Sequence, residues 1–207
     1  MVIPLLPFSA VAPGLMVFSV LLLSVYTATG LAREVETRSL GRYRLSGAGL
    51  GSLILGNVAA QLVLATVAFA AMLVAALAMG LEIKGTLVAA YCVVLLTSVG
   101  VIGIGLAIAA WVRRREDAAY LALLVCLPLG FLSGGFFPVP EWTFPGTGFN
   151  LYDLIPASHA VEALRQVIAG GGFSDVGEEL ATIGALGLAV LGMGAAMFWW
   201  RRYRVAT

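Results

Sequence analysis

Five long stretches of this chain contain no charged residue, and they constrain its fold more than any other feature. They cover residues 8–32, 47–81, 85–112, 118–139 and 180–200. A helix needs about 20 apolar residues to cross a hydrocarbon core about 30 Å thick, and each stretch is long enough. We therefore predict an all-α integral membrane protein in which residues 1–207 form a single transmembrane domain. About five spans are expected, at 8–32, 56–80, 86–112, 118–138 and 180–200, with residues 47–55 approaching the second span along the membrane surface.

The composition excludes a water-soluble domain. Only 11% of the residues are charged, 61% are hydrophobic, and the mean hydropathy is +1.01. A soluble domain carries roughly 25% charged residues, so this chain could not cover a water-facing surface. Residues 1–7 contain no Lys or Arg, so the first stretch lacks the positive region of a signal peptide.

The basic residues predict the orientation. In a five-span arrangement, ten arginines fall on one side and only Lys84 and Arg165 fall on the other. The ten are Arg33, Arg38, Arg42, Arg44, Arg113, Arg114, Arg115, Arg201, Arg202 and Arg204. Cytoplasmic loops carry an excess of Lys and Arg, so the N-terminus, as numbered here, is expected outside the cell membrane and the C-terminus in the cytoplasm.

Residues 33–46 follow the first span and carry charges of both signs. Glu34 and Arg38 are four residues apart in the better order for a helical ion pair, and Leu40 and Tyr43 continue an apolar stripe. The pattern predicts a short amphipathic helix on the membrane surface. A solvated basic loop that only fixes the topology is equally compatible with it.

Small and polar residues inside the spans predict helix packing. Asn57 and Gln61 lie one turn apart in the second span, and amides inside a bilayer are expected to bond to a neighbouring helix. Cys92 and Cys126 are expected to be small buried residues rather than disulfide partners. Glycines that favour close helix contact occur in the third and fifth spans, at Gly100, Gly103, Gly105, Gly184, Gly187, Gly192 and Gly194.

The segment between the fourth and fifth spans predicts an outer structure. Gly134, Gly135 and Pro138 stop the fourth span. Over 157–169, apolar and polar residues separate onto two helical faces, which predicts an amphipathic interfacial or re-entrant helix. Asp175 and Glu178 are expected to cap the start of the last span.

No motif indicates chemistry within the chain. His159 is the sole histidine, and we interpret it as a residue of the polar face of the outer helix, with Asp153 and Glu162 as its nearest carboxylates. A phosphate-binding loop is excluded, because Lys84 is the sole lysine and precedes its glycine. No predicted span holds an Asp, Glu, Lys, Arg or His in its interior, which disfavours a proton relay or an ion channel.

Two segments carry a resemblance to a known family. The first is the charged run Arg33-Glu34-Val35-Glu36 followed by Leu40-Gly41-Arg42-Tyr43-Arg44-Leu45-Ser46. The second is Phe131-Leu132-Ser133-Gly134-Gly135-Phe136-Phe137-Pro138 followed by Leu154-Ile155-Pro156-Ala157-Ser158-His159-Ala160-Val161-Glu162-Ala163-Leu164-Arg165. In order, spacing and topology the chain resembles, from about the first span to the C-terminus, the membrane subunit of an ABC-2 type exporter. It differs at Gly41, where the family usually has Glu, and at Gly56-Asn57, where the family usually has Gly-Lys.

The resemblance implies a permease that is not itself an enzyme and that binds no cofactor. ATP and Mg²⁺ are expected on separate ABC ATPase subunits, and the other expected partners are a second permease, identical or different, and membrane lipid, with no nucleic acid. A coupling helix would receive the ATPase motion through Arg33, Glu34, Glu36, Arg38, Leu40, Arg42 and Ser46. A re-entrant outer motif would comprise Gly134, Gly135, Pro138, Pro156, Glu162 and Arg165.

Family members usually have a further span and an outer loop ahead of the span at residues 8–32, and this chain is expected to lack them. A truncated chain, a fragment and a natural short form all agree with that expectation. It also motivates an alternative function, a non-transporting scaffold or regulatory subunit that assembles with a complete permease. Apolar walls with a few polar groups suit amphiphilic drugs, lipids or lipid-linked glycans as substrates.

Overall fold

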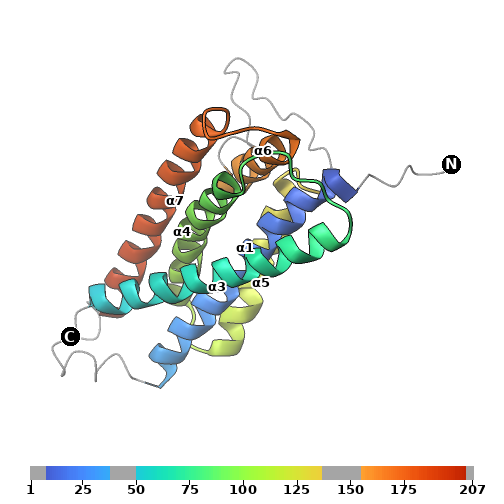
Figure 1. Ribbon diagram of the computed structural model, residues 1–207. Coiled ribbons are helices and arrows are strands. Elements are labelled where there is room, and N and C mark those ends of the chain that lie inside the picture. The colour runs from blue at the N-terminus through green and yellow to red at the C-terminus, as the bar shows by residue number, and fades with distance from the viewer. Residues whose placement is uncertain (1–7, 38–49, 137–154, 204–207) are drawn as a thin grey trace, which may run out of the picture.

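The computed structural model describes residues 8–37, 50–136 and 155–203, and the regular structure in these ranges is helical throughout (Figure 1). Six α-helices follow one another, and the last continues into a short π-helix, η2, over Trp199–Tyr203. The α-helices are α1 Phe8–Glu36, α3 Leu50–Ala78, α4 Leu87–Trp111, α5 Arg115–Leu132, α6 Pro156–Ala169 and α7 Gly177–Phe198. The predicted all-α class is confirmed.

Four of these helices, α1, α3, α4 and α7, are long and apolar enough to cross a membrane. The 25 residues of α4 extend about 38 Å at 1.5 Å per residue, which exceeds the thickness of the hydrocarbon core. α3 begins at Leu50, so residues 50–55, for which a surface approach was predicted, belong to the same continuous helix as the second span. The reason is local, because this uncharged segment contains no proline to interrupt the helix.

α5 is shorter than the predicted fourth span at 118–138. Its 18 residues begin with three charged side chains and end at Leu132, where Ser133 forms the C-cap. It nevertheless runs antiparallel to α1, because Arg115 lies beside Glu36 and Gly135 lies beside Gly14. Together with the turn that follows it, α5 therefore covers the same depth as residues 14–36 of α1.

α4 is the central helix of the bundle. In its most apolar window 67% of the residues are buried, whereas the share is 17% in both α3 and α7. It contacts α7, α1, α3 and α6 (Figure 1). α3 and α7 consequently keep wide apolar faces that are open to lipid or to another subunit.

Glycines bring α4 and α7 into backbone contact, as predicted. Gly100 lies against Gly187, and Gly103 lies against Gly194, so that a methyl group at any of these positions would meet the backbone of the facing helix. A methyl group at Gly192 would meet no atom within 4 Å apart from the adjoining part of α7 itself, so this glycine takes no part in the contact. Small residues of this kind allow helix backbones to approach closely in lipid.

The two amides of the second predicted span behave differently. The Gln61 side chain is fully buried, and its Oε1 accepts a hydrogen bond from Thr27 Oγ1 of α1 at 2.8 Å, as predicted for a bond between helices. The prediction is wrong for Asn57, whose Nδ2 donates to Leu53 O of its own helix at 3.4 Å. Both cysteines are free thiols, and Cys126 is buried, with its Sγ 2.7 Å from Ser24 Oγ.

Glycine-based caps shape the end of the bundle at which α3 and α6 terminate. Gly80, with φ 87°, ends α3 while Leu81 N donates to Ala76 O at 3.0 Å. Gly170, with φ 120°, ends α6 while Gly171 N donates to Gln166 O at 2.8 Å. Both are Schellman motifs, in which a residue of positive φ lets the chain reverse and satisfies the last carbonyls of the helix.

Candidate functional site

Of the arginines predicted on one side of the membrane, those within the described residues lie at one end of the bundle, namely Arg33, Arg113, Arg114, Arg115, Arg201 and Arg202. α1, α4 and α7 end there, and α5 begins there (Figure 1). The guanidinium of Arg201 lies 3.5 Å from the ring centroid of Trp111, which joins the end of α7 to the end of α4. Lys84 and Arg165 belong to the opposite end, with the α3–α4 connection and α6.

The first part of the predicted coupling segment continues α1. Arg33, Glu34 and Glu36 occupy its last turn, and the side chains of Arg33 and Glu36 are exposed. Glu36 Oε2 accepts a hydrogen bond from Arg115 N at 3.3 Å. A carboxylate at the first amide of α5 favours the positive end of that helix, so Glu36 links α1 to α5. The other predicted coupling residues, Arg38, Leu40, Arg42 and Ser46, lie outside the described residues.

At the opposite end, the structure brings together four residues of the predicted outer motif. Gly134, with φ 73°, follows the C-cap of α5, and its carbonyl accepts a hydrogen bond from Arg165 Nη2 at 2.6 Å. Glu162 Oε2 lies 3.6 Å from Arg165 Nη1. Gly135 packs directly on the backbone of Gly14 in α1. These contacts connect α6, α5 and α1 into one outer platform.

The remaining two members of that motif have separate outcomes. Pro156 is the first residue of α6, a position where its missing N–H has no helical partner to lose. The helix covers Pro156–Ala169, which confirms the predicted amphipathic helix at 157–169. Pro138 lies outside the described residues.

The contact between Arg165 and Gly134 gives a testable prediction. Replacing Arg165 with Gln is expected to destabilise the outer platform by about 1 kcal/mol, because a charge-assisted hydrogen bond is lost from a partly exposed side chain. Hydrogen exchange of the amides near Gly134 should accelerate. Glu162→Gln is the matched control and should change exchange little, since its ion pair is long and exposed. Equal acceleration in both variants would contradict the assignment.

Two contacts at the end of the bundle that holds α6 and the start of α7 were not indicated by the sequence. His159 Nδ1 lies 2.6 Å from Glu179 Oε2, so this residue of the outer helix contacts a carboxylate on α7. The predicted Asp153 lies outside the described residues. The predicted cap at Asp175 is wrong, because Val176 is the N-cap of α7 and Asp175 Oδ2 accepts from Gly172 N at 2.8 Å.

An aromatic cluster completes the contact between α1 and α5. The ring of Phe18 packs on Gly130, where any side chain would collide with it. Its centroid lies 6.5 Å from that of Phe131 and 5.6 Å from that of Phe136. Phe18 carries no local signal in the sequence, because an aromatic residue in an apolar span is common.

The interior of the bundle holds few groups that could do chemistry. Its side-chain hydrogen bonds join neutral groups, for example Thr66 Oγ1 and Tyr91 Oη at 2.9 Å. Among residues 8–37, 50–136 and 155–203, no three His, Cys, Asp or Glu side chains lie close enough to hold a metal ion. A small cavity of about 240 Å³ lies between α1, α4, α5, α6 and α7, and Leu21, Thr97 and Ile104 are among its lining residues.

Comparison with known proteins agrees with this architecture. The sequence model of the ABC-2 type transporter family matches residues 2–169, which leaves the α7 segment outside the match. The daunorubicin resistance ABC transporter permease protein DrrB1 of Streptomyces coeruleorubidus is 32% identical over 174 residues, covering 80% of this chain and 59% of that protein. Nodulation protein J of Rhizobium meliloti (strain 1021) is 28% identical over 134 residues, covering 65% of this chain and 50% of that protein.

The chain therefore spans between 50% and 59% of the length of these relatives. The match covers far more than half of the chain, and the chain belongs to the ABC-2 type transporter family.

Proposed function

We propose that the chain is the permease subunit of an ATP-driven exporter in the cell membrane, which takes its energy from a separate ATPase subunit. One observation carries the proposal. At the charged end of the bundle, Glu36 at the end of α1 accepts a hydrogen bond from the first amide of α5. A partner that moves the end of α1 would thereby also move α5. ATP and Mg²⁺ belong to that partner in this scheme, and this chain supplies only the path.

The charges at that end suit a soluble partner. Arg33, Glu34 and Glu36 present both signs within one turn of helix, and complementary charges of this kind give orientation and specificity to docking. The excess of arginine at the same end supports its placement in the cytoplasm, with the N-terminus, as numbered here, outside.

The size of the interior cavity supports a path between two permease subunits. Drug-sized ligands occupy pockets of about 300–1,000 Å³, and the cavity between α1, α4, α5, α6 and α7 is smaller, at about 240 Å³. α3 and α7 have open apolar faces that a second permease could cover. The name of one relative, a daunorubicin resistance permease, supports an amphiphilic drug-like molecule as the substrate class, and lipids or lipid-linked glycans share that chemistry.

Gentle purification of the tagged chain from its native host tests the proposal. We expect an ABC ATPase subunit to co-purify in stoichiometric amount, and co-expression of the two chains to lower the cellular content of an amphiphilic drug. Recovery of the chain without an ATPase would refute the exporter function. Recovery together with a complete permease would support the alternative, a scaffold or regulatory subunit.

A further inference from the structure

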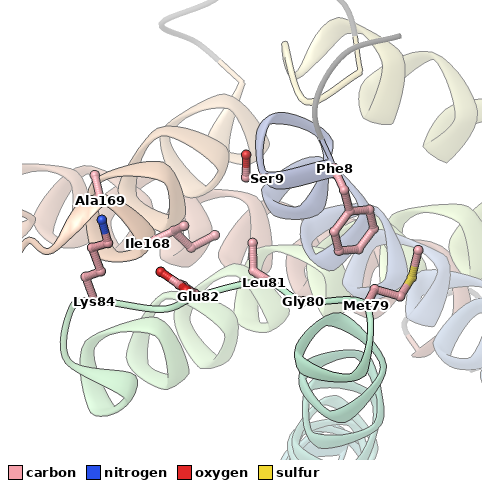
Figure 2. Close-up of a pocket in the computed structure, with 9 residues that line it drawn as sticks. All are labelled: Phe8, Ser9, Met79, Gly80, Leu81, Glu82, Lys84, Ile168 and Ala169. Atoms are coloured by element: carbon pink, nitrogen blue, oxygen red, sulfur yellow. The ribbon is translucent and has the colours of Figure 1, made fainter.

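A second cavity, of about 620 Å³, lies at the end of the bundle at which α3 and α6 terminate (Figure 2). Three elements line it, namely the start of α1, the connection between α3 and α4, and the end of α6. Its lining includes Phe8, Met79, Leu81, Glu82, Lys84 and Ile168. Apolar and charged groups therefore line the cavity together, at the ends of two helices that are long enough to cross a membrane.

The wall formed by the α3–α4 connection is held in place by backbone contacts. Lys84 N donates to Ile168 O of α6 at 3.3 Å. Gly85 packs on the carbonyls of Val167 and Gly171, with no room for a side chain. The Schellman motif at Gly80 fixes the direction in which the connection leaves α3. The shape of the cavity is thus preformed.

Two opposite charges face this cavity without neutralising each other. Glu82 and Lys84 are both exposed. Leu81, the residue before Glu82, is buried and forms part of the apolar lining. Figure 2 shows both side chains projecting from the connection toward α6. Neither takes part in an ion pair within 4.0 Å among the residues that the structure describes. One anion and one cation, two residues apart, are available to a ligand.

We propose that this cavity binds the headgroup of a zwitterionic phospholipid that carries a primary amine, such as phosphatidylethanolamine. Lys84 donates to the phosphate, and Glu82 accepts hydrogen bonds from the ammonium group. A quaternary ammonium has no N–H to donate, so phosphatidylcholine fits less well. The exposed Met79 side chain, together with Val74 and Leu77 on α3, offers an apolar surface for the acyl chains.

A lipid is favoured over a soluble zwitterion by the position of the cavity. It lies at the first residue of α1 and the end of α3, two helices long and apolar enough to cross a membrane, next to the exposed apolar side chains of α3. The inference does not depend on the ATPase or on transport, because the binding can be measured on the purified chain alone.

Native mass spectrometry of the full chain in detergent tests the site. Phosphatidylethanolamine, phosphatidylcholine and phosphatidylglycerol with identical acyl chains are offered in equal amounts, and the bound fraction of each is measured. We expect the ethanolamine lipid to bind about fivefold better than the other two, because one exposed ion pair to its ammonium group contributes an effect of about this size. Glu82→Gln should remove this preference, and Lys84→Gln should lower the bound fraction of all three lipids.

The control variant is Glu178→Gln, which removes an exposed carboxylate from the first turn of α7 at the same end of the bundle. It should leave the lipid preference unchanged. Unchanged binding in the Glu82 and Lys84 variants would overturn the site. Displacement of the lipid by glycerophosphoethanolamine at an equal concentration would overturn the lipid as its occupant, since the acyl chains would then contribute nothing.

Discussion

Gly103→Ala and Gly194→Ala are each expected to destabilise the helical bundle by about 2–3 kcal/mol, the effect of inserting a group into a closely packed interior. A methyl group on Gly103 would lie 2.5 Å from Leu191 N and closer still to Val190 O of α7. One on Gly194 would collide with the carbonyl of Gly103 itself. Because the obstacles are backbone atoms, no rotation of a side chain relieves the clash, and α4 and α7 must separate.

Gly192→Ala is the matched control, since it lies on the same helix two residues away from Gly194. A methyl group at Gly192 would meet no atom of another helix within 4 Å. There the substitution should be neutral or stabilise by up to about 1 kcal/mol, because alanine restricts the unfolded chain more than glycine does. Unfolding of all three variants by sodium dodecyl sulfate in mixed micelles measures the difference. Equal stability of Gly192→Ala and Gly194→Ala would show that the two helices do not meet at these glycines.

The features that the sequence predicted well depend on local patterns. An uncharged stretch with the length of a bilayer must form a helix, because no water is present in the hydrocarbon core to satisfy its backbone. The separation of apolar from polar residues over Pro156–Ala169 likewise depends only on neighbours three and four positions away. The glycines at 100, 103, 187 and 194 indicated close helix packing, because small residues let helix backbones approach in lipid, and the structure shows that they join α4 to α7.

The features that the sequence missed depend on contacts between distant segments. His159 and Glu179 are 20 residues apart and meet only because α6 folds back on the first turn of α7. Phe18 and Gly130 meet only because α5 runs antiparallel to α1. Spacing gave Asp175 a plausible capping role, yet its carboxylate binds Gly172 N within the turn instead. Local competition of this kind is common for Asp, whose short side chain reaches several backbone amides.

The largest effect on function is expected at the charged segment that follows α1. Replacing Arg42 with Glu should lower ATP-dependent export by on the order of tenfold or more, because truncating an anchor at a protein interface costs about 2 kcal/mol or more in binding. Arg42 stands in the part of the sequence that resembles a coupling helix, and reversal of its charge adds repulsion to the loss of contact. The basal ATPase rate of the isolated partner should stay unchanged.

Glu36→Gln tests the same mechanism at a described contact. It weakens the link to Arg115 N, so the ATPase should still bind while export falls, since motion of α1 no longer passes fully to α5. Arg204→Glu is the control, because it reverses an arginine in the C-terminal tail on the same predicted side of the membrane. For all three variants, export is measured in proteoliposomes, and co-purification of the ATPase is measured in detergent. If Arg42→Glu exports as well as Arg204→Glu does, the segment after α1 is not where the ATPase acts. If Glu36→Gln loses the ATPase altogether, Glu36 belongs to the docking surface instead of linking α1 to α5.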